Sequence, residues 1–183
     1  MTSPNKTFSL QTQPLAYLFS VAIGEARSRG VELDLSGRVT DNLSLIGTYA
    51  YTDARITRDN PDSTTLQSNQ GHRLPNTPEH SGSLWAKWSF SQESLLGWNV
   101  GVGIYLAGNR QGDNLNSYQM PGYARLDAMT GYSWSVGGGR LTAQVNINNL
   151  LDKQYYAASR FRREATITPG DPLTVLGSIR LEY

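Results

Sequence analysis

Aromatic and basic side chains gather in a polar stretch near the end of the chain, between residues 150 and 173. The residues whose types suit ligand recognition there are Tyr155, Tyr156, Arg160, Phe161, Arg162 and Arg163. Guanidinium groups pair with anions and stack on flat rings, so this composition predicts a contact surface for an anionic, partly aromatic ligand. Alternatively, the arginines pair with phosphate groups or with Glu164. The residue types alone fit either interpretation.

Residues that often perform acid–base chemistry are sparse. The chain has two histidines, of which His72 lies in a polar region and His80 begins an alternating segment on its apolar side. Neither stands beside a nucleophile with a positioned partner, so the sequence predicts no catalytic residue and no enzyme. Asp53, Asp59 and Asp62 lack the dense ligand spacing of a calcium loop, which favours a solvated loop and predicts no metal site and no cofactor.

Composition excludes several classes of protein. A formal net charge of +1 over 183 residues gives no electrostatic reason to expect a nucleic-acid partner. The absence of cysteine removes disulfides and thiol chemistry. Apolar runs are too short for a transmembrane helix, and residues 1–13 show no signal peptide. If the mature protein is exported, we therefore expect this chain to be a fragment or a processed form.

The elements that position these residues are segments in which apolar and polar side chains alternate. In residues 141–148 the apolar side chains take every second position and Thr, Gln and Asn take the others, which predicts a two-faced strand. Residues 173–183 repeat this pattern. The same alternation predicts further strands at 15–23, 31–39, 43–52, 82–90, 98–106 and 124–134, with a weaker candidate at 6–13 and a charged stretch at 25–30 separating the first two.

The connections between these strands alternate in length. Short turns are predicted at 40–42, 91–96 and 137–139, and long polar loops after Ile56, Gly108 and Leu150. Neighbouring antiparallel strands would place every long loop at one end of the sheet. The pattern predicts an all-β fold, namely an antiparallel transmembrane β-barrel segment of about eight strands with long extracellular loops and short periplasmic turns. Apolar stretches of about nine to eleven residues have the length that crosses a bilayer.

Alternation alone does not show which face meets water. In a soluble lipocalin-like barrel or a sandwich the apolar face would point inward, whereas in a membrane barrel it faces lipid. The membrane interpretation places these charged residues in a wet lumen: Glu32, Asp34, Arg38, Arg125, Asp127, Arg180 and Glu182. Aromatic residues near the strand ends and the aromatic terminal residue Tyr183 favour this interpretation, because interfacial girdles are aromatic.

Several ordered motifs resemble the barrel of TonB-dependent siderophore receptors, over nearly the whole chain from about residue 15. The motifs are GEARSRGVEL at 24–33, NLSL at 42–45, YAYTDA at 49–54, LPNTPEHSGSLW at 74–85, PGYARLD at 121–127, NINNLLDKQYY at 146–156 and PGDP at 169–172. Two positions depart from the family pattern: Leu173 stands where arginine is common, and Tyr183 stands where phenylalanine is usual.

The resemblance implies an outer-membrane protein of a Gram-negative bacterium that takes up ferric siderophores, with iron held inside the siderophore ligand and not by a protein cofactor site. The implied partners are the ferric siderophore, outer-membrane lipid and lipopolysaccharide, and the TonB complex. The family's N-terminal plug, TonB box and the rest of its barrel of about 22 strands have no counterpart here. We therefore expect residues 1–183 to be the C-terminal part of such a barrel, unable to perform coupled transport alone.

Two other classes of protein fit parts of the pattern. An even number of strands permits a small closed outer-membrane barrel with a structural or adhesive role. An outer-membrane hydrolase would need serine and histidine on the lumen side near a loop, which the strand register does not provide. The motifs favour the siderophore receptor.

Overall fold

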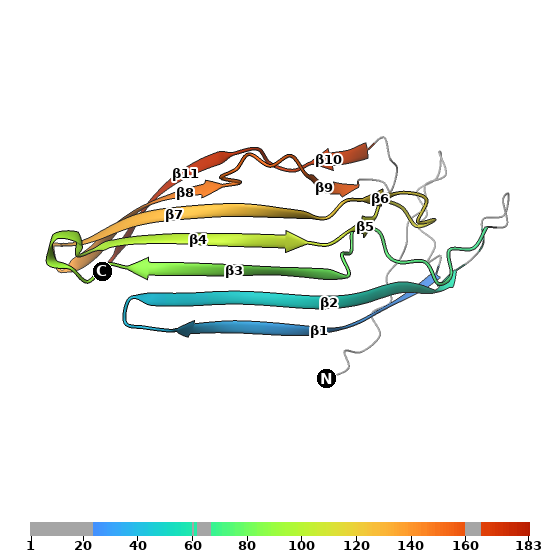
Figure 1. The fold of residues 1–183 in the computed structure, drawn as a ribbon, viewed down its shortest axis with the longest axis horizontal. Coiled ribbons are helices and arrows are strands. Elements are labelled where there is room, and N and C mark those ends of the chain that lie inside the picture. Colours follow the sequence, from blue (N-terminus) through green and yellow to red (C-terminus); the bar gives the residue numbers. More distant parts are fainter. Residues whose placement is uncertain (1–23, 60, 62–66, 160–165) are drawn as a thin grey trace.

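The computed structural model describes residues 24–59, 61, 67–159 and 166–183. Its main element is a seven-stranded antiparallel sheet in which each strand pairs with the next main strand along the chain. The strands are β1 (Gly24–Arg38), β2 (Leu43–Asp59), β3 (His80–Ser89), β4 (Trp98–Ala107), β7 (Tyr123–Val136), β8 (Gly139–Asn148) and β11 (Thr174–Glu182). Figure 1 shows them side by side in one twisted layer, and β1 and β11 are its two edges.

The connections are sorted by length, as predicted. The turns after β1, β3 and β7 lie at one end of the sheet, and the long segments after β2, β4 and β8 lie at the other (Figure 1). The turn between β7 and β8 consists of Gly137 and Gly138, with φ of 57° and 89°. Positive φ at both central residues is the geometry of the tightest hairpin turns, and glycine adopts it without a steric penalty. The other end of the sheet is therefore the loop end.

Some details differ from the sequence predictions, and others are untested. The charged stretch at 25–30 does not interrupt a strand: β1 runs through it, with a bulge between Glu25 and Ala26, because it pairs with a β2 that continues to Asp59. The predicted strands at 6–13 and 15–23 lie outside the described residues. Two regions predicted as loops contain short ladders, β5 (Arg110–Gln111) with β6 (Gln119–Met120) and β9 (Tyr156–Ser159) with β10 (Ile167–Pro169), and the connection after β3 contains a 3-10 turn, Glu93–Leu95.

The strand register sorts the side chains onto two faces, since directly paired residues project to the same side of a sheet. Leu84 is paired with Gly47 and Ile104, and Ile104 with Leu126, so one face is apolar from β2 to β7. The pairs of Val145 with Thr130 and Gly177 extend it towards β11. The opposite face carries all the charged residues that the sequence placed in the lumen: Glu32, Asp34, Arg38, Arg125, Asp127, Arg180 and Glu182.

The apolar face has no protein packed against it in the described part of the chain. Val31, Leu33 and Ile179 are 64%, 63% and 78% exposed. Burial of one such side chain contributes about 2 kcal/mol, so a sheet that leaves a whole face uncovered requires an apolar environment. The buried apolar side chains of the described residues instead lie near the loop end: Ala26, Ala54, Ile56, Ala107 and Met120.

Aromatic residues mark the two ends of this apolar face, as the sequence predicted. Trp98 and Tyr132 are neighbours at the turn end, with ring centroids 5.0 Å apart, and Trp134 follows at 5.5 Å from Tyr132. Tyr49 and Tyr51 lie towards the loop end. These are the positions of interfacial girdles in a membrane-spanning sheet. Among the described residues, no helix combines the length and the apolar character needed to cross a bilayer.

Candidate functional site

A cluster of tyrosines lies on the polar face of the sheet at the loop end. Tyr105 belongs to β4 and Tyr123 begins β7, and their ring centroids are 5.9 Å apart. Tyr155, from the connection after β8, stacks on Tyr123 with 4.2 Å between the centroids. Its ring occupies the space that a side chain at Gly170 would need. The polar face thus carries a set of aromatic rings where the strands meet the loops.

Arg125 joins this aromatic cluster to an acidic partner on its own strand. Two positions apart on β7, Arg125 and Asp127 project to the same face, and Arg125 Nη2 lies 2.8 Å from Asp127 Oδ2. The guanidinium also donates to Tyr155 Oη at 3.4 Å and lies 5.8 Å from the centre of the Tyr105 ring. The cation is therefore held in place by one carboxylate, one tyrosine hydroxyl and one aromatic ring.

Arg110 is a second cation of this region, and it is almost fully buried. Its guanidinium donates to the carbonyl oxygens of Tyr156 and Ala157 at 2.5 and 2.8 Å, and it lies 5.2 Å from the centre of the Tyr123 ring. It ties the segment after β4 to the segment after β8. No pattern in the sequence predicts this role, because a loop arginine carries no periodicity and its carbonyl partners are not encoded by residue type.

The three long connections are fastened to one another. Asn76 donates to the carbonyl of Ser159 at 2.9 Å and accepts from the Ser159 N–H at 2.7 Å, although 83 residues separate them. The Asn76 N–H also donates to the Gln111 carbonyl at 2.9 Å. Tyr118 Oη and Ser159 Oγ lie 2.6 Å apart. Asn76 thus joins the connection after β2 to the other two.

A second set of contacts links the first two connections. His72 Nδ1 lies 2.9 Å from the Asn114 carbonyl oxygen, and the Arg73 N–H donates to Asn116 Oδ1 at 2.9 Å. Arg73 also makes two hydrogen bonds of 2.6 Å to the Glu79 carboxylate. These bonds hold the pKa of Glu79 below its usual value and raise that of Arg73. The loop end is a connected polar layer.

Asn149 organises the beginning of the last connection. It is 1% exposed, and its backbone N–H donates to Asp127 Oδ1 at 2.8 Å. Its side chain donates to the carbonyls of Lys153 and Asp171 at 3.0 and 2.9 Å and accepts from the Lys153 N–H at 2.8 Å. These bonds hold the base of the segment that presents Tyr155, which gives a physical role to the NNLLD part of the sequence motif.

The residues that the sequence predicted for ligand recognition have different positions. Tyr155 lies inside the aromatic cluster. Tyr156 is 46% exposed and contributes its carbonyl to Arg110. Arg160, Phe161, Arg162 and Arg163 lie outside the described residues, so their role stays a prediction. Sequence reasoning missed Tyr105, Tyr123 and Arg110, although Tyr105 could have been found as a large ring at a polar-face position of an alternating strand.

The histidines and aspartates considered for chemistry have protein partners. His80 contacts the rings of Tyr49 and Tyr51, and its Nδ1 lies 2.9 Å from Tyr49 Oη. Asp53 pairs with Arg55, and Asp59 accepts hydrogen bonds from Asn69. Asp62 lies outside the described residues. In the part of the chain that the structure describes, no three histidine or acidic side chains come together as metal ligands.

The sheet has an exposed apolar face bounded by aromatic residues, a polar opposite face, and long connections that are hydrogen-bonded to one another at one end. These features define the wall of an outer-membrane β-barrel. The family model described as TonB dependent receptor-like, beta-barrel, matches residues 2–150. The chain belongs to this family, whose members are outer-membrane β-barrel proteins.

Named relatives and solved structures agree with this assignment. The metal-pseudopaline receptor CntO of Pseudomonas aeruginosa is 37% identical over 161 residues, covering 87% of this chain and 21% of that protein. The ferrichrome outer membrane transporter/phage receptor of Escherichia coli K12 is 34% identical, covering 84% and 20%. The solved ferric preacinetobactin receptor BauA of Acinetobacter baumannii matches with a TM-score of 0.73 and 26% identity, covering 89% and 23%. The chain therefore spans about a fifth of the length of the relatives it matches.

Proposed function

We propose that the chain is the C-terminal part of the barrel of a receptor that takes up ferric siderophores across the outer membrane, energised through TonB. The named relatives support this proposal, since they include receptors or transporters for metal-pseudopaline, ferrichrome and ferric preacinetobactin. The open sheet does not favour a small closed barrel, because among the described strands β1 and β11 each have one unpaired edge.

The observation that carries the proposal is the lumen-facing cluster of Tyr105, Tyr123, Tyr155 and Arg125 below a fastened loop layer. Flat rings and a held guanidinium suit an anionic or aryl-bearing chelate that enters from the loop side. Such a chelate supplies all the ligands of its iron, so the wall needs neither a metal site nor a catalytic group. Coupling to TonB and contact with lipid and lipopolysaccharide belong to the same proposal.

The experiment uses cells that carry the complete reading frame encoding this chain. Uptake of radiolabelled iron is measured with a panel of hydroxamate, catecholate and carboxylate chelates, with and without a functional TonB. We expect TonB-dependent uptake of at least one chelate. Absence of uptake and of binding for the whole panel, in a receptor that reaches the outer membrane, would contradict the proposal.

A pair of variants tests the site itself. Tyr123→Leu removes the central ring of the lumenal cluster and should weaken chelate binding by about tenfold, the size of one lost ring or cation–π contact. Tyr51→Leu is the matched control, because Tyr51 is paired with Val31 on the apolar face. Equal affinities in the two variants would remove the cluster from the binding site.

A further inference from the structure

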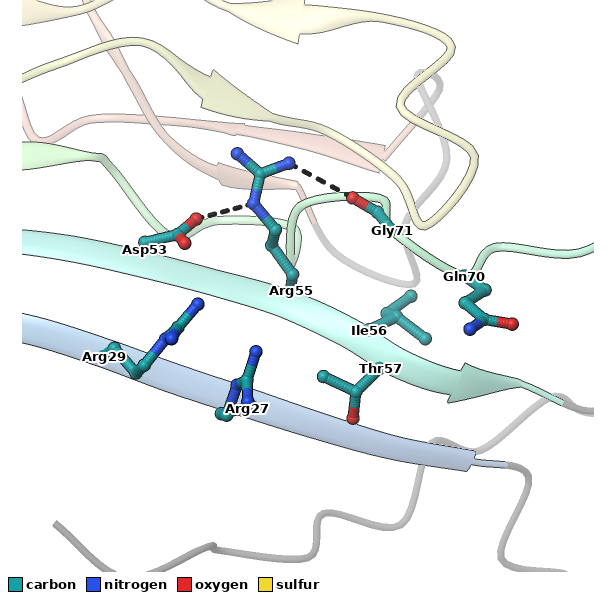
Figure 2. A pocket seen from close by; sticks show the side chains of 8 residues that line it. All are labelled: Arg27, Arg29, Asp53, Arg55, Ile56, Thr57, Gln70 and Gly71. Atoms are coloured by element: carbon teal, nitrogen blue, oxygen red, sulfur yellow. Dashed lines mark hydrogen bonds and ion pairs between the residues drawn. The ribbon is translucent and has the colours of Figure 1, made fainter. Parts of the chain in front are cut away.

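A hollow of about 380 Å³ opens at the loop end of β1 and β2 (Figure 2). Four charged side chains contribute to its lining: Arg27 and Arg29 from β1, and Asp53 and Arg55 from β2. Gln70 and Gly71 from the following connection complete one side. Three cations around a single carboxylate leave an excess of positive charge in the hollow.

The strand register places these charged residues on the lipid-facing side of the wall. Arg27 is paired with Arg55 and Arg29 with Asp53, and the next pairs down the same face are Val31 with Tyr51 and Leu33 with Tyr49. On the opposite side at this level, Ala26 and Ala54 are buried, and Ile56, which also contributes to the lining, is 1% exposed. The guanidinium groups therefore continue the outer, apolar row of side chains and do not line the lumen.

The arginines differ in how they are neutralised. Arg55 Nε lies 2.6 Å from Asp53 Oδ1, and Arg55 also donates to the Gly71 carbonyl at 3.2 Å (Figure 2). Arg27 and Arg29 are exposed, and no carboxylate of the described residues lies within ion-pair distance of either. Two guanidinium forks on adjacent outward positions of one strand are thus available to an anion.

Position along the strand decides which anion these arginines meet. With a rise of about 3.3 Å per residue and a tilt of about 40°, Arg29 lies about 5 Å beyond Val31 along the membrane normal, and Arg27 about 10 Å. The headgroup layer extends about 5–8 Å beyond the hydrocarbon on each side. Since Val31 is the last apolar residue of the row and Tyr51 beside it has the character of an interfacial residue, Arg29 lies at headgroup height. Arg27 begins just beyond this layer, and its long side chain can reach back into it.

We propose that this hollow binds a phosphate group of an outer-leaflet lipid. Arg27 and Arg29 contact the phosphate, and Arg55, which is paired with Asp53, forms one side of the site. A lipid phosphate is the anion that a membrane presents at this height and on this side of the wall. The lipid's acyl chains then lie along Val31 and Leu33, the exposed apolar residues directly below. The site rests on the lipid contact of the proposed function, but it is separate from the lumenal cluster and does not depend on which chelate the receptor transports.

The test measures lipid binding to the receptor that carries this chain, purified in detergent and titrated with phosphorylated lipid A, with lipid A whose phosphates have been removed, and with inorganic phosphate. Arg27→Ser/Arg29→Ser should bind phosphorylated lipid A at least about tenfold more weakly than the unmodified receptor. The matched control is Arg38→Ser, which removes another exposed arginine of β1 from the lumenal face at the turn end. It should leave affinity unchanged.

Each arm has a defined meaning. Preference for phosphorylated over dephosphorylated lipid A, lost in the double variant alone, supports the proposal. The proposal is overturned if the receptor binds the two lipids with equal affinity, or if Arg38→Ser loses as much affinity for phosphorylated lipid A as the double variant does. Tight binding of inorganic phosphate that the lipid does not displace also overturns it. Heat-dependent migration in gels confirms that each variant is folded. Iron uptake is recorded separately, so that failure of the lipid site and failure of the transport proposal are distinguishable.

Discussion

The part of the sheet that crosses the membrane and the layer at its loop end are held together differently. Along the membrane-crossing part, backbone ladders join the strands and large apolar side chains such as Val145 and Ile179 remain exposed. At the loop end, polar residues such as Arg110, Asp127, Asn149 and Ser159 are buried and bonded. The first region thus depends on lipid, whereas the second carries its own network of hydrogen bonds.

This difference determines where each kind of residue is tolerated. A polar substitution is costly where the surroundings are lipid, since nothing there can satisfy the new group. A loss of polar groups is costly at the loop end, where each removed side chain leaves buried backbone groups without partners. Introducing a polar side chain is therefore costly in the membrane-crossing part of a strand, whereas removing one is costly at its loop end.

The largest effect is expected from a charge on the lipid-facing side. Val145→Lys places an ammonium near the middle of β8 on the apolar face and should reduce the free energy of unfolding in lipid vesicles by about 3 kcal/mol. Its neighbour Gln144 projects to the polar face, so Gln144→Lys should cost about 1 kcal/mol or less, mainly through its lost bond to Asn146. Urea titration followed by tryptophan fluorescence measures both. Equal costs would mean that the faces are assigned wrongly.

The next effect is expected at Asn149, at the base of the last connection, where the glycine variant should cost less than Val145→Lys and the alanine variant about as much. Asn149→Gly keeps the positive φ of 55° without strain but removes the side-chain bonds to Lys153 and Asp171, which should cost about 2 kcal/mol. Asn149→Ala should cost about 1 kcal/mol more, because alanine resists this backbone conformation. Limited proteolysis should show faster cleavage after β8 in both variants. Unchanged stability in the glycine variant would show that the Asn149 side chain has no structural role.

The ion pair between Arg73 and Glu79 predicts a local dependence on pH. Hydrogen bonds from Arg73 lower the pKa of Glu79 in the folded protein, so the stabilisation is complete above the usual glutamate pKa of about 4.3 and is lost as pH falls through the lowered value. Amide hydrogen exchange in residues 67–79 should therefore accelerate when the pH falls well below the usual glutamate pKa. Glu79→Gln removes the titrating group and should abolish this change. If hydrogen exchange accelerated at low pH only in the strands, the Arg73–Glu79 ion pair would not be the cause of the pH dependence.

Sequence reasoning predicted the strands well because membrane-facing positions must be apolar at every second residue. It failed at Glu25 and Arg27, where the strands continue beyond the hydrocarbon and charged side chains are permitted on the outer face. It could not pair Asn76 with Ser159, since a hydrogen bond to a distant backbone leaves no periodic trace. Tyr155 was identified by its type and its loop, whereas Tyr123 and Arg110 are defined by contacts that only the fold creates.

The smallest effect on stability is expected for Tyr156, and it sharpens the contrast between packed and available side chains. Tyr155 is stacked on Tyr123 and packed against Gly170, so Tyr155→Ala should destabilise the loop end by about 2 kcal/mol. Tyr156 is 46% exposed and uses its backbone carbonyl to contact Arg110, so Tyr156→Ala should change stability by about 0.5 kcal/mol or less. If Tyr156 is a ligand contact, this variant still weakens chelate binding. Unchanged affinity in Tyr156→Ala would restrict recognition in this segment to Tyr155 and the predicted residues beyond Ser159.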